Sequence, residues 1–75
     1  MKNCIYLNLT AELIKHRHTL VDIAESIGKS LPTLYAKLKG KTEFTLSEME
    51  SIQAFFYEKD GEPFTLDYLF TKFKK

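Results

Sequence analysis

His16 and His18 are the first residues whose types and spacing could do chemistry, because imidazoles close together in a chain are frequent metal ligands. Two residues apart on a helix, their side chains point to different faces. The sequence has no third histidine and no cysteine near them, so no ligand set is complete. We expect no bound metal, and we interpret both histidines as surface residues with partial charge near neutral pH.

Catalytic chemistry is not indicated elsewhere in the chain. The carboxylates of its second half are dispersed, and neither a base nor a nucleophile is spaced to work with them. The sequence contains three glycines and no glycine-rich loop of the kind that holds phosphates. We therefore expect a protein that is not an enzyme, with no cofactor and no small-molecule substrate.

Charged residues are unevenly distributed along the chain. Residues 12–41 carry six cations against three acids, whereas residues 42–70 carry seven acids against one lysine. Charged side chains cover the surface of any small domain, so a charge run alone means little. Here the basic segment coincides with the helical pattern of residues 19–40, which favours a functional role for its charge.

Length and composition indicate one domain, residues 1–75, that buries roughly 60% of the surface of its unfolded chain. Hydrophobic residues make up 44% of the sequence, enough for a compact core. Cys4 has no partner for an intramolecular disulfide, which fits a reducing compartment. The apolar start is interrupted by Asn8 and Glu12 and lacks a signal cleavage pattern, so we expect a cytoplasmic protein with no membrane partner.

Helical spacing dominates the sequence and predicts five helices. The first covers about residues 6 or 8 to 17. The second begins after Thr19, which forms a capping box with Asp22, and it ends at Gly28. The inward-facing residues of these two helices are Leu9, Leu13, Ile14, Leu20, Ile23, Ala24 and Ile27.

The third helix begins at the cap Ser30, accepts Pro32 in its first turn and ends at Gly40. A second capping box, Thr45 with Glu48, opens the fourth helix. Its inward-facing residues are Leu46, Met49, Ile52 and Phe56. Residues 60–63 have turn chemistry, residues 64–70 form a short fifth helix begun at Thr65, and the tail 71–75 is expected to fray.

Two short helices that cross steeply need a small residue where they approach and a glycine where the backbone reverses, and Ala24 and Gly28 supply both. The chain resembles the phage repressor class of helix-turn-helix proteins, the Cro-like and lambda-repressor-like domains, with the helix-turn-helix itself at residues 19–40. The residues that carry this resemblance are Asp22, Ile23, Ala24, Ile27, Gly28, Ser30, Thr33, Leu34, Tyr35, Leu38, Gly40, Lys41 and the run 44–49. The resemblance covers nearly the whole chain, and residues 64–70 are similar to the tail of small phage regulators from Gram-positive bacteria.

The resemblance implies an all-α, compact five-helix bundle that binds double-stranded DNA as a transcription regulator of phage or prophage origin. Residues 30–39 become the recognition helix in the major groove. Base-facing positions are implied at Lys29, Ser30, Leu31, Pro32, Thr33 and Ala36. Phosphate contacts are implied at Arg17, Thr19, Lys37, Lys39, Lys41, Thr42 and the amide ends of the second and fourth helices, with His16 and His18 near phosphates.

Several positions depart from the pattern of this class. Leu20 stands where such domains often place a phosphate-binding glutamine, and Lys29 replaces a frequent apolar residue. Leu31, Pro32 and Ala36 stand where side chains that form two hydrogen bonds with one base would be expected, so sequence preference must come partly from thymine methyls and DNA shape. The alternative is a protein-interaction module, an antirepressor or adaptor, that keeps the fold without binding DNA.

The C-terminal aromatic residues have two interpretations. In one, the fifth helix folds over them and they complete the core of the monomer. In the other, they are exposed in the monomer and pair in a weak homodimer, which would place DNA half-sites about 34 to 36 Å apart. The residues concerned are Phe55, Phe56, Tyr57, Phe64, Tyr68, Phe70 and Phe73.

Overall fold

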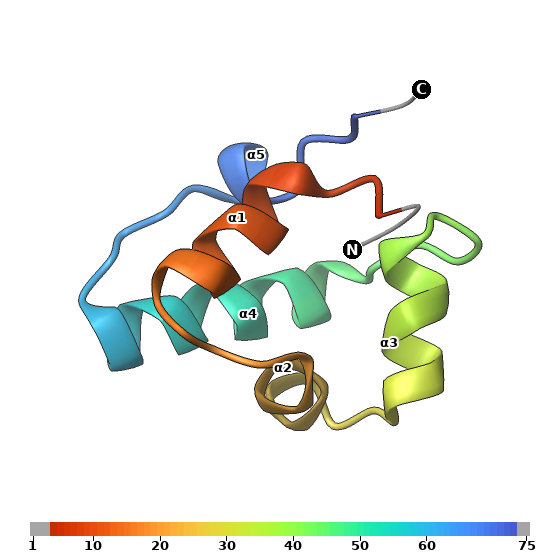
Figure 1. The fold of residues 1–75 in the computed structure, drawn as a ribbon, viewed down its shortest axis with the longest axis horizontal. Helices are drawn as coiled ribbons and strands as arrows, with labels where there is room; N and C mark the ends of the chain where they lie inside the picture. Colours follow the sequence, from red (N-terminus) through yellow and green to blue (C-terminus); the bar gives the residue numbers. More distant parts are fainter. Residues whose placement is uncertain (1–3, 74–75) are drawn as a thin grey trace.

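Five helices joined by short connections make up residues 4–73, the part of the chain that the computed structural model describes (Figure 1). The helices are α1 (Leu7–Lys15), α2 (Leu20–Ile27), α3 (Leu31–Leu38), α4 (Leu46–Asp60) and α5 (Leu66–Leu69). These residues contain no β-strand, so the predicted all-α class is confirmed. No helix in this range combines the length and the apolar character needed to cross a membrane.

The starts of four helices are formed by local hydrogen bonds that the sequence predicts. The hydroxyls of Thr19, Ser30, Thr45 and Thr65 each accept a bond from the backbone amide three residues on. Asp22 and Glu48 return a carboxylate to the amides of Thr19 and Thr45, completing both capping boxes. Each pair satisfies two amides that have no partner inside the helix.

The fifth helix is shorter than predicted, Leu66–Leu69 instead of residues 64–70, and the first helix differs from its predicted range at its end. It starts at Leu7 without a side-chain cap and ends at Lys15, two residues before the expected end. Arg17 adopts a left-handed conformation with φ of +60°, and the amide of His18 returns to the carbonyl of Leu13. The chain therefore reverses here without a glycine, which no pattern in the sequence indicated.

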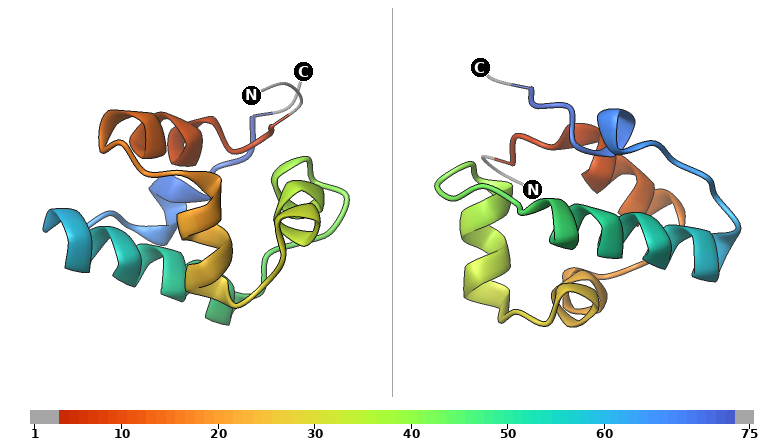
Figure 2. Two further views of the ribbon diagram at one scale, coloured as in Figure 1. Left: turned by 60° about the horizontal axis from the view of Figure 1, so that its bottom comes forward. Right: turned by 180° about the vertical axis from the view of Figure 1, so that it is seen from behind.

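The core is arranged around α4, which lies between α2 on one side and α1 with α5 on the other (Figures 1 and 2). Two side chains expected to face inward do not. Ile14 is 73% exposed because it lies about 140° around α1 from the buried Leu9, and Leu46 is 58% exposed because it lies about 160° around α4 from the buried Glu48. The fully buried side chains are Leu9, Ile23, Leu34, Leu38, Ile52, Phe56 and Leu69.

Most of the C-terminal aromatic residues belong to this core. Phe56 is fully buried, and Phe55, Phe64 and Phe70 pack against it or its neighbours. Of the seven aromatics considered, the exposed ones are Tyr57, Tyr68 and Phe73. This packing contributes to the monomer core: it buries Phe56 fully and leaves Phe55, Phe64 and Phe70 half-buried.

The two ends of the described chain are bonded to each other, and the N-terminal one is bonded to the end of α3. The amide of Ile5 bonds to the carbonyl of Leu38 at 3.0 Å, and the amide of Phe73 bonds to the carbonyl of Ile5 at 2.7 Å. Gly40, with φ of +84°, passes so close that an added Cβ would lie 2.8 Å from Ile5 Cδ1. Residues 71–73 of the expected fraying tail are therefore bonded to the fold, and residues 74–75 lie outside the described range.

Candidate nucleic-acid interface

The connection between α2 and α3 contains a left-handed glycine. Gly28 has φ of +68°, its amide bonds to the carbonyl of Glu25, and the next amide, that of Lys29, returns to Ala24 at 3.0 Å. Nothing would meet a Cβ at Gly28, so glycine is needed for its backbone conformation and not for space. The turn lets α3 leave α2 steeply, so that α2 is seen end-on beside an upright α3 in Figure 1.

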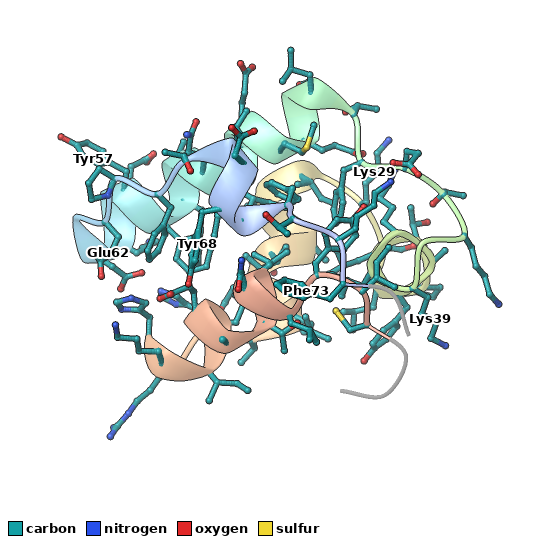
Figure 3. The ribbon with its side chains drawn as sticks, turned by 90° about the horizontal axis from the view of Figure 1, so that it is seen from above. Lys29, Lys39, Tyr57, Glu62, Tyr68 and Phe73 are labelled. Atoms are coloured by element: carbon teal, nitrogen blue, oxygen red, sulfur yellow. The ribbon has the colours of Figure 1, made fainter. Side chains whose placement is uncertain are left out.

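The side of α3 that faces away from α2 lies at one end of the molecule (Figures 1 and 2). Lys29 and Lys39 project at this end, opposite Tyr57 and Glu62 (Figure 3). Of the six base-facing candidates, Lys29, Ser30, Pro32 and Thr33 are exposed. Ala36 is half-buried, and Leu31 packs partly against the core.

The phosphate-contact candidates fall into three groups. Lys39, Lys41 and Thr42 are exposed in the connection that follows α3. Arg17 and Thr19 are also exposed, but they lie in the connection between α1 and α2. Lys37 forms the third group by itself, because its side chain is buried inside the protein.

Lys37 is 8% exposed and does not support the phosphate role expected of it. Its Nζ lies 3.0 Å from Glu48 Oε1, donates to the carbonyl of Glu43 at 3.1 Å and lies 5.9 Å from the centre of the Phe44 ring. An ammonium held by a carboxylate and a carbonyl has its charge largely compensated inside the protein. Position 37 is three residues after Leu34, so the spacing of the third helix was a signal that this side chain faces inward.

Glu48 lies at the centre of this arrangement and is 7% exposed. The same Oε1 atom that binds Lys37 accepts the Thr45 amide at 2.9 Å. Burial alone would raise the pKa of Glu48, but the Thr45 amide and the Lys37 ammonium together hold that pKa below its usual value. The carboxylate is therefore charged at neutral pH and connects α3 to the start of α4.

The amide ends of α2 and α4 are unsuited to the phosphate contact expected of them. Each is closed by a carboxylate, Asp22 on α2 and Glu48 on α4, and the Thr19 amide bond lowers the pKa of Asp22. A carboxylate at a helix start both occupies the amides and repels another anion. The first turn of α3, in contrast, contains no acidic residue.

His16 and His18 are half-buried against aromatic rings, which corrects the expectation of surface histidines near phosphates. Their rings stack with centroids 6.4 Å apart and meet the rings of Phe55, Phe56 and Phe64 edge to face. Because α1 ends at Lys15, the two histidines follow the helix end, and the different-faces rule for a helix does not apply. Both are turned toward the C-terminal end of α4, away from α3.

Three carboxylates converge on these two imidazoles. His18 Nε2 lies 2.7 Å from Asp60 Oδ2, and His16 Nε2 lies 3.5 Å from Glu12 Oε1 and 3.3 Å from Glu62 Oε2. Two buried atoms of the cluster, Glu12 Oε1 and His16 Nε2, make no hydrogen bond with the described residues. No three His, Cys, Asp or Glu side chains within residues 4–73 are arranged to hold a metal ion.

Tyr68 closes the carboxylate cluster from α5. Its hydroxyl donates to Glu12 Oε2 at 2.6 Å, and this bond, followed by burial, raises the pKa of the phenol. The partners are 56 residues apart in the chain, so no local pattern could have predicted the contact.

Comparisons of the chain with protein-family models, curated proteins and solved structures gave no match.

Proposed function

We propose that this chain is a sequence-preferring, double-stranded-DNA-binding transcription regulator of phage or prophage origin that acts in the cytoplasm by occupying an operator. The observation that carries the proposal is the exposed side of α3 at one end of the molecule, with exposed hydroxyls in its first turn and exposed lysines just before its start and just after its end. The steep turn leaves one side of α3 exposed, and the major groove is wide enough to admit an α-helix. The lysines near the two ends of α3 can contact the negatively charged phosphates. The resemblance of residues 19–40 to phage repressor domains points the same way.

Phosphate binding in this proposal comes from fewer residues than the sequence implied. Lys39, Lys41 and Thr42 extend the surface beyond the end of α3, and Lys29 adds a cation at its start. Lys37 is removed from the set because its ammonium is already paired. Affinity that depends on these cations should fall steeply as salt is added.

Base reading rests on short side chains. Ser30 and Thr33 offer hydroxyls, although Ser30 Oγ also bonds to Thr33 Oγ1 at 3.1 Å, while Pro32 and Ala36 offer apolar contacts to thymine methyls. None of these side chains forms the paired hydrogen bonds of arginine with guanine or of asparagine with adenine. We therefore expect a modest sequence preference with a large contribution from DNA shape.

A salt-titrated gel shift on DNA flanking the encoding gene tests the proposal. The variant Lys39→Gln/Lys41→Gln should weaken binding and reduce the dependence of log K on log salt by up to about 1.8 for two phosphate contacts. The matched control Lys15→Gln/Lys59→Gln removes the same charge from exposed positions at the ends of α1 and α4, on the other side of the molecule (Figure 1), and should change the slope little. Folded protein that binds no DNA even at low salt would refute the function.

The alternative, a protein-interaction module, is favoured by one observation on α1. Leu7, Ala11 and Ile14 are exposed and follow helical spacing along one side of this helix. An apolar stripe in water is typical of a protein contact. If Leu7→Ser/Ile14→Ser abolishes the regulatory effect in cells while DNA binding in the gel shift is unchanged, the function of the chain lies on α1.

A weak homodimer remains part of the proposal, restricted to the exposed aromatics Tyr57, Tyr68 and Phe73. Sedimentation equilibrium of the wild type and of Tyr57→Ser tests it. A wild type that stays monomeric at high concentration would exclude this dimer and, with it, the two half-sites expected about 34 to 36 Å apart.

A further inference from the structure

We infer that Lys37 and Glu48 form a positioning pair that sets how α3 and the connection after it are presented to DNA, with neither residue contacting the DNA. The inference rests on the proposed function. Lys37 is on the inner side of α3, and Glu48 is in the first turn of α4, so their 3.0 Å contact joins the two helices directly.

Lys37 and Glu48 together make contacts in three parts of the protein: α3, the start of α4 and the connection between them. Glu48 Oε1 accepts from both Lys37 and the Thr45 amide, so the bond that caps α4 and the bond that holds α3 share one atom. The Lys37 ammonium is also fixed to the connection between the helices, because it donates a hydrogen bond to the carbonyl of Glu43. A shift of α3 would therefore break both contacts of the Lys37 ammonium, with Glu48 at the start of α4 and with the carbonyl of Glu43 in the connection.

The exposed phosphate candidates depend on this arrangement. Lys39, Lys41 and Thr42 lie between Lys37 and Glu43, so both ends of their segment are held by the same ammonium. The bonds from Gly40 to Lys37 and from Lys41 to Ala36 close the segment further. The positions of these side chains depend on the backbone that carries them and not on their charge alone. The buried pair fixes this backbone relative to the start of α3.

A purely apolar replacement of the pair separates positioning from electrostatics. The variant Lys37→Met/Glu48→Leu removes one charge of each sign, so the net charge of the protein is unchanged, and replacing both partners of a buried pair by apolar residues is usually tolerated by a fold. Lys39→Gln is the comparison for a residue proposed to contact phosphate. Lys37→Arg keeps a cation at the buried position and should retain most of the affinity.

We expect the double variant to bind DNA about 10-fold more weakly at every salt concentration, at a temperature where it is fully folded, with an unchanged salt slope. Lys39→Gln should reduce the slope by about 0.9, the value for one phosphate contact. If the double variant reduced the slope by a similar amount, Lys37 would be a phosphate contact. If its affinity stayed within 2-fold of the wild type, the pair would not position α3.

Amide hydrogen exchange of residues 31–44 supplies a second measurement that requires no DNA. The double variant should exchange at least 10-fold faster there than the wild type, whereas amides of α1 should exchange as before. Equal exchange would overturn the inference. If the wild type binds no DNA, the proposed function fails, and the exchange rates alone then decide whether the pair holds α3.

Discussion

The two ends of α4 carry buried charge in opposite arrangements. At its start, one ammonium from α3 faces one carboxylate and one carbonyl, at 3.0 and 3.1 Å. At its other end, two imidazoles face the three carboxylates of Glu12, Asp60 and Glu62, and two buried atoms lack a hydrogen bond among the described residues. The first end is matched in charge, and the second carries an excess of acid.

This difference indicates what each end contributes. The pair beneath α3 joins one cation to one carboxylate and one carbonyl, so its charges compensate each other inside the protein. At the far end, the two imidazoles pack against the rings of Phe55, Phe56 and Phe64, and their carboxylate neighbours outnumber them. The surface proposed to bind DNA thus lies on the end of the molecule whose internal charges are paired one to one.

The largest expected effect comes from breaking the matched end. Glu48→Gln keeps the shape of the side chain but leaves the Lys37 ammonium without its counter-charge, and it should lower the free energy of unfolding by about 3 kcal/mol. Urea denaturation of the wild type and the variant at pH 7 measures the difference. A loss below about 1 kcal/mol would show that the pair is solvated like a surface ion pair.

The same substitution should lose its effect in acid. Because the pKa of Glu48 is lowered in the folded state, the stability it contributes is present above its ordinary pKa and disappears as the pH falls through the lower folded value. The difference between wild type and Glu48→Gln should therefore shrink between about pH 5 and pH 3. A difference that is constant over this range would mean that charge is not its cause.

Glu12→Gln is the matched substitution at the far end, where the residue is buried as deeply as Glu48. The amide oxygen can still accept from Tyr68, its NH₂ group can donate to His16 Nε2, and one of three neighbouring carboxylates is removed. We expect a change in unfolding free energy of less than about 1 kcal/mol, measured in the same denaturation series. If Glu12→Gln costs as much as Glu48→Gln, the contrast between the two ends is wrong.

The smallest expected effect is spectroscopic. The pKa of Tyr68 is raised first by its bond to Glu12, so its contribution to stability is present below its ordinary pKa and is lost as the pH rises through the higher folded value. Glu12→Gln should move the ionisation of Tyr68 to lower pH in an absorbance titration at alkaline pH. A Tyr68→Phe variant identifies which part of the titration belongs to this residue.

Much of the helical framework was predictable because it is encoded locally. Thr19 with Asp22 and Thr45 with Glu48 form capping boxes within four residues, and Gly28 ends its helix by its own backbone conformation. The end of α1 was missed because Arg17 adopts a left-handed conformation that favours glycine. Its identity as an arginine carries no signal for that turn.

The candidate interface was predictable in part for the same reason. Which residues belong to α3 and its turn follows from caps and spacing, and Lys29, Ser30, Pro32 and Thr33 are exposed at the positions where base contacts were expected. The charge of Lys37 favours an exposed position, whereas its spacing three residues after Leu34 favours a buried one. Only a carboxylate from another helix makes its burial possible.

The number of helices, their caps and the glycine turn before α3 can thus be predicted from the sequence, because they depend on hydrogen bonds between residues close together in the chain. Which charged groups are buried, and beside which partners, depends on the packed fold, since His18 and Asp60 lie 42 residues apart and Tyr68 and Glu12 lie 56 residues apart. A buried charge is stable only beside a partner, and the chain's long-range packing determines which partners meet.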